Sequence, residues 1–307
     1  MKVLNFGSIN VDVVFRVSHI VRPAETIPSQ GMEVHPGGKG ANQSVALARA
    51  GATVLHAGQV GKDTSWMAER LCKEGVDIRH VLVSDSVNGG QAIIQVDDNG
   101  QNSIIIHGGA NQAIPEAHIA KALADMDKGD WLVLQNEINL TPNLIDAAHQ
   151  AGLNICLNPA PMTEAVHSFN LQAVNLFIVN EIEGAELARL PGDSAPETVL
   201  AALAEMFPQA TICMTLGADG SCCWSAATGV IRQPAYPVKA VDTTAAGDTF
   251  TGFFLAELIG GRRVSKRLTP PRAPPPSPCR ATAPSIPSRT KKNLPANTSA
   301  TCHISSY

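Results

Sequence analysis

Short apolar runs alternate along the chain with longer segments in which apolar residues recur every three or four positions. The first pattern is typical of buried strands, and the second of helices that bury one face. The strands predicted in this way span 2–7, 53–60, 131–135, 154–157, 176–179 and 211–215, and the helices span 38–50, 63–73, 115–126, 142–150, 181–190 and 195–206. Asp63 is expected to cap the second helix. This strand–helix order predicts a three-layer α/β/α fold with a mostly parallel sheet.

A second group of predicted strands does not fit that alternation. These strands lie near 13–17, 31–35, 89–97 and 103–107. Between the last two, Asp98-Asn99-Gly100 is a strong hairpin signal. We expect these strands to form a small β-sheet that stands off the main sheet, from segments near 11–36 and 88–107. A further hairpin, 222–225 with 230–233, precedes the last predicted helix.

The last predicted helix follows a string of small residues and begins near Ala246. Phe250, Phe253, Phe254 and Leu258 are spaced to share one face of it. The first N–H groups of a helix lack intrahelical partners and carry the positive end of its dipole. Because the side chains there are small, an anion such as a phosphate can approach that backbone closely.

Asp248 stands in the first turn of this helix, where its carboxylate is stabilised and could accept a proton from a hydroxyl nucleophile. Taken alone, an Asp at this position is more often a residue that only stabilises the helix, through its interaction with the positive end of the dipole. The complete string from Val241 to Phe250 is more informative than the single residue.

The composition changes sharply after Gly260. Nine of the 21 prolines fall between Pro270 and Pro295, and the segment lacks helical and strand periodicity. Such a composition does not bury enough apolar surface to offset the entropy of ordering, so we expect disorder over 261–307. The abrupt change also favours the hypothesis of a reading-frame shift near Gly261, which resequencing the source gene would test.

Charge is distributed unevenly along the 307 residues. The formal net charge is −4, but nine Lys or Arg and no acidic residue follow Glu257. The first 257 residues therefore hold 14 basic against 27 acidic residues, a net of −13. An acidic body of this kind argues against a nucleic-acid-binding surface.

Seven cysteines, an odd number without zinc-finger spacing, lie mostly in apolar runs. This usage favours a reducing, cytoplasmic compartment. No stretch approaches the roughly 18 apolar residues of a membrane span. A signal peptide is not expected either, because Asn5, Asn10 and Asp12 interrupt the first apolar segment.

Two strings of residues carry a resemblance to a known family. Val241–Phe250 resembles the anion-hole and catalytic-base motif of the ribokinase-like carbohydrate kinases. A second string resembles the sugar-binding motif of the same family, and it reads Pro36-Gly37-Gly38-Lys39-Gly40-Ala41-Asn42-Gln43. The resemblance covers residues 1–260. It implies a ribokinase-like fold with a β-sheet lid, and an ATP-dependent kinase that phosphorylates a sugar hydroxyl, with ribose the first substrate to test.

The resemblance also implies roles for individual residues. Phosphoryl transfer needs an aligned hydroxyl and donors for the developing charge. Asp248 would be the base, and the backbone N–H groups of Ala246, Gly247 and Asp248 would form the anion hole. The sugar would be bound by Asn10, Asp12, Gly38, Lys39, Gly40, Asn42 and Glu137, together with Asp248. Asn10 and Asp12 follow the first strand, at the carboxyl edge where open α/β sheets bind ligands.

Further elements imply the sites for nucleotide and ions. Asn180 and Glu183 form an element that resembles the N-x-x-E element of this family. The resemblance implies that Asn180 approaches the nucleotide phosphates and that Glu183 organises magnesium through water. Another string of this chain resembles a turn that borders ATP in this family, and it reads Thr215-Leu216-Gly217-Ala218-Asp219-Gly220. The nucleotide-binding residues would thus be Asn180, Thr215, Gly217, Gly220 and Gly247, and potassium would be bound by Asp242 and the carbonyl of Thr244. Short N-x-x-E patterns and Gly-rich turns are common, so each is weak evidence alone. Asn158-Pro159-Ala160-Pro161 is expected to be a structural bend.

Other functions stay open at this stage. A P-loop is disfavoured because Gly40 follows Lys39, and the glycines do not have dinucleotide-binding spacing. The tail does not match the region that walls the adenine pocket and completes the potassium site in this family. A catalytically impaired sugar-binding protein is therefore one alternative, and a kinase for deoxyribose, another sugar or a nucleoside is another. Exposed lid strands also make a homodimer through the lid plausible.

Overall fold

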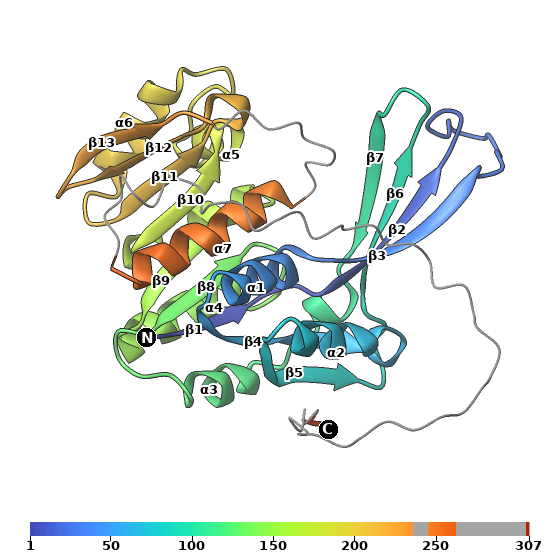
Figure 1. The fold of residues 1–307 in the computed structure, drawn as a ribbon, viewed down its shortest axis with the longest axis horizontal. Helices are drawn as coiled ribbons and strands as arrows, with labels where there is room; N and C mark the ends of the chain where they lie inside the picture. The colour runs from blue at the N-terminus through green and yellow to red at the C-terminus, as the bar shows by residue number, and fades with distance from the viewer. Residues whose placement is uncertain (236–244, 262–304, 307) are drawn as a thin grey trace, which may run out of the picture.

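The computed structural model describes residues 1–235, 245–261 and 305–306 (Figure 1). A large sheet lies between helices, and a small second sheet projects from one side of it (Figure 1). In the part of the chain that is described, no helix has the length and apolarity needed to cross a membrane. Asp242, Thr244 and nearly all of the predicted tail lie outside the described residues.

The large sheet confirms the predicted α/β architecture. Its strand order is β13-β12-β11-β10-β9-β8-β1-β4-β5-β14. In this spatial order, every neighbouring pair between β11 and β14 is parallel. At the other edge of the sheet, β12 pairs antiparallel with both β11 and β13. The bounds are β1 (Lys2–Phe6), β4 (Thr53–Gly61), β5 (Asp77–Ser84), β8 (Trp131–Gln135), β9 (Asn154–Asn158), β10 (Leu176–Asn180), β11 (Thr211–Thr215), β12 (Ser221–Ser225), β13 (Gly229–Gln233) and β14 (Ser305–Ser306).

Helices cover both faces of this sheet. The α-helices are α1 (Lys39–Arg49), α2 (Trp66–Lys73), α3 (Ala117–Leu123), α4 (Thr141–Ala151), α5 (Glu181–Leu187), α6 (Pro196–Met206) and α7 (Ala246–Ile259), and the short 3₁₀ helices are η1 (Lys62–Thr64), η2 (Gly109–Gln112), η3 (Glu164–Ser168), η4 (Leu171–Ala173) and η5 (Gly217–Asp219). α1, α2 and α7 bury their apolar side chains in one core, and α3 to α6 in the other. Val3 and Leu4, adjacent on β1, are fully buried in opposite cores, as expected for a strand covered on both faces.

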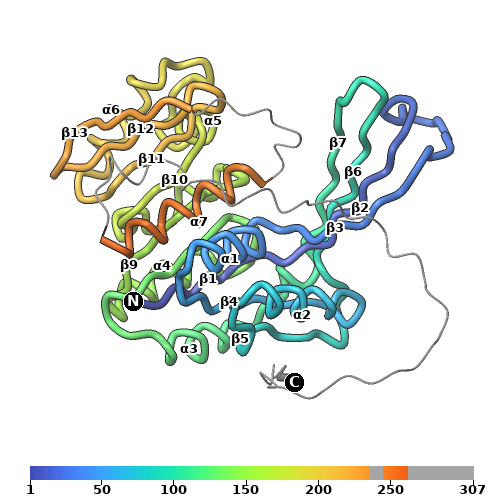
Figure 2. Tube along the Cα trace, in the orientation of Figure 1, coloured from blue at the N-terminus to red at the C-terminus, as the bar shows by residue number. Residues whose placement is uncertain are grey.

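The small sheet, hereafter the lid, has the order β3-β2-β6-β7 (Figure 2). Its strands are β2 (Asn10–Arg16), β3 (Gly31–Gly37), β6 (Gly90–Val96) and β7 (Asn102–His107). β6 and β7 form the predicted hairpin, in which Gly100 adopts a φ of 78° and donates its N–H to the Asp97 carbonyl at 3.0 Å. Ile104, Ile105 and Ile106 on β7 are exposed.

The closing helix α7 begins at Ala246, as predicted, and of the four apolar residues spaced to share one face only Phe254 is fully buried. The buried residues are Asp248, Thr251, Gly252, Phe254 and Leu255, whereas Phe250, Phe253 and Leu258 are only partly buried. The reason is the packing of α7 against α1, since a Cβ added at Gly252 would lie 2.4 Å from the Cβ of Ala46. The small face of α7, and not its aromatic face, therefore makes the closest helix contact and brings Asp248 to α1.

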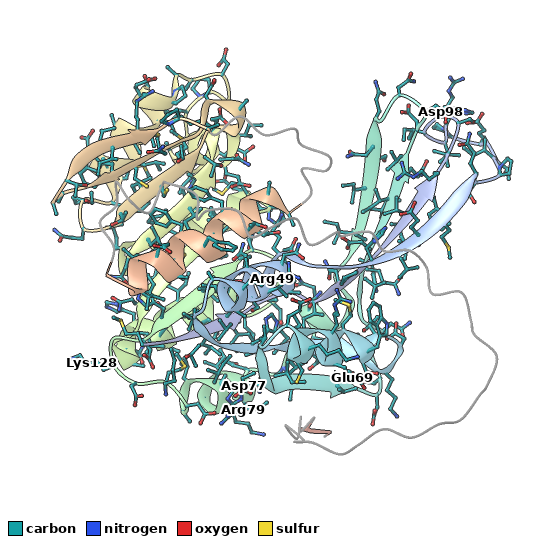
Figure 3. The ribbon with its side chains drawn as sticks, viewed as in Figure 1. Arg49, Glu69, Asp77, Arg79, Asp98 and Lys128 are labelled. Atoms are coloured by element: carbon teal, nitrogen blue, oxygen red, sulfur yellow. The ribbon has the colours of Figure 1, made fainter. Side chains whose placement is uncertain are left out.

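Strand β5 was not predicted from the apolar pattern. Asp77, Arg79 and His80 interrupt its apolar pattern (Asp77 and Arg79 are labelled in Figure 3), and these polar residues pair with one another or with Asp125. A guanidinium–carboxylate bond of 2.7 Å joins Arg79 to Asp77. Charged side chains satisfied in this way can lie on a strand near the sheet edge without the alternation that identifies a strand.

The predicted cap at Asp63 is also wrong. Residues 62–64 form η1, and α2 begins only at Trp66, after Ser65. The Asp63 carboxylate instead accepts the backbone N–H of Gly89 at 3.0 Å. Asp63 thus fixes the start of the second lid hairpin, a long-range contact that local capping rules do not include.

Candidate active site

The N-terminus of α7 presents backbone donors and one carboxylate. Ala245 precedes the helix with a left-handed φ of 58°, and its carbonyl accepts the first helical N–H, that of Thr249, at 2.9 Å. The N–H groups of Ala246, Gly247 and Asp248 therefore precede the hydrogen-bonded ladder. Ala246 and Gly247 are exposed, while Asp248 is only 8% exposed. An anion approaching this helix end would meet backbone N–H groups and small side chains.

Two amides from α1 hold the Asp248 carboxylate. Asn42 donates its Nδ2 to Oδ2 at 3.1 Å, and Gln43 donates its Nε2 to Oδ1 at 2.9 Å. Each carboxylate oxygen thus accepts one hydrogen bond from a neighbouring helix. Charge-assisted bonds of this kind are stronger than neutral ones, and together they fix the plane of the carboxylate.

Glycines allow α1 to begin directly on the loop that follows β1. Gly38 has a φ of 93°, and a Cβ there would lie 2.8 Å from the backbone nitrogen of Asn10. A Cβ at Gly40 would lie 2.5 Å from the nitrogen of Ser8. Larger residues at either position would push the helix away. Gly38 and Gly40 therefore serve the close approach of the backbones.

A cavity of about 260 Å³ lies between the lid and the edge of the large sheet. We call it the lid cavity; it is lined by Asn10, Ile106, Gly108, Asn111, Gln112, Asn136, Glu137 and Pro161. Asn111 donates to the Asn10 side-chain oxygen at 2.7 Å and accepts the N–H of Ile9 at 3.0 Å. These bonds fix the polar atoms of the lining in advance of any ligand.

Carboxylates give this region a negative character. Glu137 accepts the hydroxyl of Ser8 and, at 3.2 Å, the backbone N–H of Lys39. Burial, followed by the charge of Glu137, raises the pKa of Asp12 to about 6, against the opposing effects of His35 and Lys39. Acceptors of this type are suited to binding several hydroxyl groups of one ligand.

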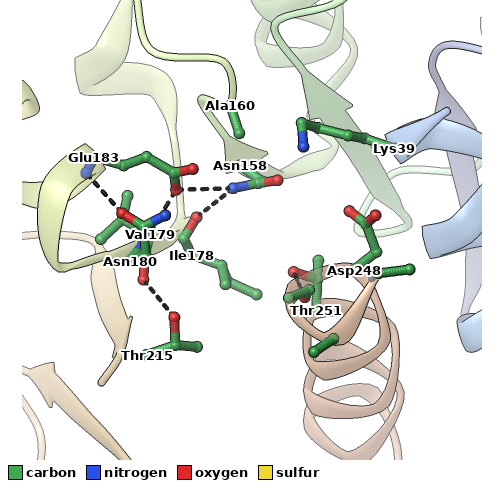
Figure 4. A pocket seen from close by; sticks show the side chains of 13 residues that line it. Lys39, Asn158, Ala160, Ile178, Val179, Asn180, Glu183, Thr215, Asp248 and Thr251 are labelled. Carbon is green, nitrogen blue, oxygen red and sulfur yellow. Dashed lines mark hydrogen bonds between the residues drawn. The ribbon is translucent and has the colours of Figure 1, made fainter. Parts of the chain in front are cut away.

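A second cavity, of about 190 Å³, opens at the start of α7 (Figure 4). We call it the helix cavity; it is lined by Lys39, Asn158, Ala160, Ile178, Val179, Asn180, Glu183, Thr215, Ala245, Ala246, Gly247, Asp248 and Thr251. The strands β9, β10 and β11 end at its wall, so it lies at the carboxyl edge of the parallel sheet. The amino group of Lys39 and the carboxylate of Asp248 face one side of it, opposite Glu183 (Figure 4).

Asn180 and Glu183 form a capping box at the start of α5. The Asn180 side chain accepts the N–H of Glu183 at 2.8 Å, and Glu183 accepts the N–H of Asn180 at 3.1 Å. Burial, as the first cause, raises the pKa of Glu183, and Asp248 and Glu186 add to this effect. One oxygen of Glu183 is thus engaged by the cap, and the carboxylate still faces the helix cavity.

A divalent cation at this wall would have few protein ligands. In the described ranges, no group of three His, Cys, Asp or Glu residues gathers that could hold a metal ion. Glu183, with one oxygen in the cap, suits a cation that keeps most of its water and takes its other ligands from phosphates, as Mg²⁺ commonly does.

The predicted site residues fall into three groups. Asn10 and Glu137 line the lid cavity, whereas Lys39, Asn180, Glu183, Thr215, Ala246, Gly247 and Asp248 line the helix cavity. Asp12, Gly38, Gly40 and Asn42 lie beside them without lining either cavity, and Gly217 and Gly220 also line neither. A Cβ at Gly220 would lie 2.1 Å from the Gln233 carbonyl, so strand packing alone accounts for that glycine.

Sequence reasoning missed several polar residues of the site. Asn158, taken for part of a bend, lines the helix cavity and contacts both Gln43 and Glu183. Ser8 and Asn111 hold Glu137 and Asn10. Asn158 ends a buried strand of the parallel sheet, and that position was the signal available for it.

The model of the pfkB family of carbohydrate kinases matches residues 1–269, and the chain belongs to this family. A ribokinase of Haemophilus influenzae is 34% identical over 260 residues, which cover 82% of this chain and 84% of the relative.

Solved structures agree with this membership. A ribokinase from Cryptococcus neoformans var. grubii serotype A in complex with ADP has a TM-score of 0.76 and 35% identity, covering 87% of this chain and 90% of its own. A ribokinase from Arabidopsis thaliana complexed with ribose and ATP has a TM-score of 0.76 and 27% identity, covering 87% and 88%. The protein is therefore a carbohydrate kinase with a ribokinase-like fold.

Proposed function

We propose that this chain transfers the γ-phosphoryl group of ATP to ribose and so forms ribose 5-phosphate. The observation that carries the proposal is the junction of the two cavities at the start of α1. Lys39 there donates its N–H to Glu137 of the lid cavity, and its side chain faces the helix cavity beside Asp248. A sugar in the first cavity and a nucleotide in the second would meet at Asp248. Relatives named ribokinase, one of them complexed with ribose and ATP, support this choice.

In this proposal each side of the site has its own task. Asp248 accepts the proton of the attacking hydroxyl, and the N–H groups at the start of α7 stabilise charge on the transferred phosphoryl group. The ribose is bound by Asn10, Asp12, Gly38, Lys39, Gly40, Asn42 and Glu137. The nucleotide contacts Asn180, Thr215 and Gly247, with Gly217 and Gly220 in the adjoining turn.

Two ions complete the proposal. Magnesium, held through water by Glu183 and directly by the nucleotide phosphates, would neutralise charge that develops on the phosphoryl oxygens. Potassium would bind Asp242 and the carbonyl of Thr244, which lie outside the described residues. We also propose that the kinase domain spans residues 1–260, that it acts in the cytoplasm, and that it forms a homodimer through the lid strands.

The test is ADP production in the presence of ribose, ATP, magnesium and potassium, with Asp248→Asn as the control. The variant should lose about 10²–10⁴-fold in kcat, because a general base is removed while the shape of the side chain is kept. Ribose should still raise the melting temperature of both proteins. A wild-type chain that binds ribose without turnover would contradict the proposal and identify a sugar-binding protein.

A further inference from the structure

A row of buried amides runs from the Asp248 carboxylate into the core. Gln43, which is fully buried, donates its Nε2 to Asp248 at 2.9 Å and to the side-chain oxygen of Asn158 at 3.1 Å. Its Oε1 accepts the Nε2 of Gln135 at 2.7 Å, and Gln135 also donates to the Asn5 Oδ1 at 3.1 Å. All the polar atoms of the Gln43 side chain are therefore engaged within the protein.

The direction of this row is determined by a main-chain carbonyl. Asn5 donates its Nδ2 to the carbonyl of Gly40 at 2.8 Å, and a carbonyl can only accept. The Asn5 oxygen must then face Gln135, the nitrogen of Gln135 must face Gln43, and the nitrogen of Gln43 must face Asp248. Rotating any one amide would place two donors or two acceptors against each other.

One polar atom is left unsatisfied by this arrangement. The Oε1 of Gln135 is buried without a hydrogen-bond partner within the described part of the chain. A buried acceptor without a partner is unfavourable. Rotating the Gln135 amide would not relieve it, because the oxygen would then face the oxygens of Asn5 and Gln43. The orientation that serves Asp248 is thus kept although one acceptor stays unpaired.

Gln43 differs from its neighbour Asn42 in what it can reach. Asn42 is half-buried and borders the site, so a bound sugar can compete with Asp248 for its amide. Gln43 is enclosed between α1, α7 and the sheet, and it cannot contact a substrate. If a bound sugar takes the amide of Asn42, Gln43 remains the donor that holds Asp248 Oδ1.

We infer that Gln43, oriented by Gln135 and Asn5, is the positioning residue for the base of this kinase. It fixes the carboxylate plane of Asp248 and, through Asn158, ties that carboxylate to the wall that carries Glu183. This inference rests on the proposed function, since it assigns to Asp248 the role of base.

The first test is Gln43→Met, which keeps the length and helix propensity of the side chain and removes its donors. We expect kcat to fall about 10- to 100-fold, the value of one hydrogen bond to a charged group, while the KM for ribose changes less than about threefold. Gln135→Met, one bond further away, should lower kcat by a smaller factor. Gln59→Met is the matched control, because it makes the same substitution at a buried glutamine that donates to the Ala113 carbonyl, outside this row of amides, and it should leave kcat within about twofold.

A double-mutant cycle separates positioning from stability. In an Asp248→Asn background, Gln43→Met should lower kcat by no more than about twofold, because the carboxylate that Gln43 orients is already gone. Equal losses in both backgrounds, or a wild-type kcat in Gln43→Met, would overturn the inference while the proposed function stood. A wild-type chain without ribose-dependent ADP production would instead overturn the proposed function, and the positioning role with it.

Discussion

The lid cavity and the helix cavity meet at α1 but are built from different chemistry. The lid cavity is lined by side-chain amides and a carboxylate beside the apolar Ile106 and Pro161, and hydrogen bonds such as the one from Asn111 to Asn10 fix the amides in advance. The helix cavity is lined largely by the first turns of α5 and α7 and by the ends of parallel strands. The lid cavity presents its polar groups on side chains, whereas the helix cavity adds the backbone N–H groups at the start of α7 to the side chains of Lys39, Glu183 and Asp248.

This difference determines which substitutions should matter on each side. Side-chain changes should damage either cavity, while the helix cavity should in addition be sensitive to changes that add bulk or move a helix end. The two cavities are not independent, because α1 and α7 must stay in contact for Asp248 to serve both.

The largest effect is expected from breaking that contact. Gly252→Ala places a Cβ 2.4 Å from the Cβ of Ala46, so α7 must shift away from α1. Overpacking of this kind costs about 2–3 kcal/mol of the free energy of unfolding. Urea denaturation should show that loss, and the shift of Asp248 should lower turnover on both substrates. Gly260→Ala is the matched control at the C-cap of the same helix, where the nearest atom would be 3.4 Å away, and it should change stability by less than about 0.5 kcal/mol.

An effect confined to the nucleotide side, without a loss of stability, is expected at Gly247. A Cβ there would have no neighbour within 4 Å, so Gly247→Val should fold normally and project its side chain into the helix cavity. Obstructing one backbone donor should cost about 3 kcal/mol of transition-state stabilisation, roughly 100-fold in kcat/KM for ATP. The melting-temperature shift induced by ribose should be unchanged. A loss of ribose binding in this variant would show that the cavities are not separable.

The sequence was sufficient for the features that depend on local pattern. It predicted the parallel sheet, the lid strands and the start of α7, because apolar periodicity and the turn at Asp97–Gly100 are local signals. It did not predict β5 or the contact from Asp63 to Gly89, since both depend on polar groups satisfied from distant segments. Local spacing also could not identify Gly252 as the contact to α1.

The polar network was beyond sequence reasoning for the same reason. Gln43 could be read only as part of a motif, because its partners Gln135, Asn158 and Asp248 lie 92, 115 and 205 positions away along the chain. Nothing in the local pattern indicates which of several buried amides face one carboxylate. Their arrangement follows only from the assembled sheet and helices.

The pH dependence of stability in an Asp12 variant tests the lid side of the site. Its pKa in the folded protein is raised to about 6 from an ordinary value of 3.8, so ionising Asp12 opposes folding. The loss of folding free energy caused by ionising Asp12 is absent below pH of about 3.8, the unfolded pKa. It grows between the unfolded and folded pKa values and is complete above pH of about 6. Asp12→Asn should therefore stabilise the protein by up to about 3 kcal/mol near pH 8 and have little effect near pH 3.5. Urea midpoints at the two pH values measure this, and equal midpoint changes at both would contradict it.

The smallest effect is expected at Glu183. Its carboxylate completes the capping box of α5 and also faces the helix cavity. Glu183→Ala removes the cap contact to the Asn180 N–H and should cost about 1 kcal/mol of stability. Glu183→Gln retains an oxygen that can accept that N–H, so its stability should stay near wild type. If the carboxylate also organises magnesium, both variants should need about tenfold more magnesium for half-maximal turnover, with an unchanged KM for ribose. A magnesium requirement that rises in Glu183→Ala alone would assign Glu183 to the helix cap, and the cation would then depend on the nucleotide and its waters.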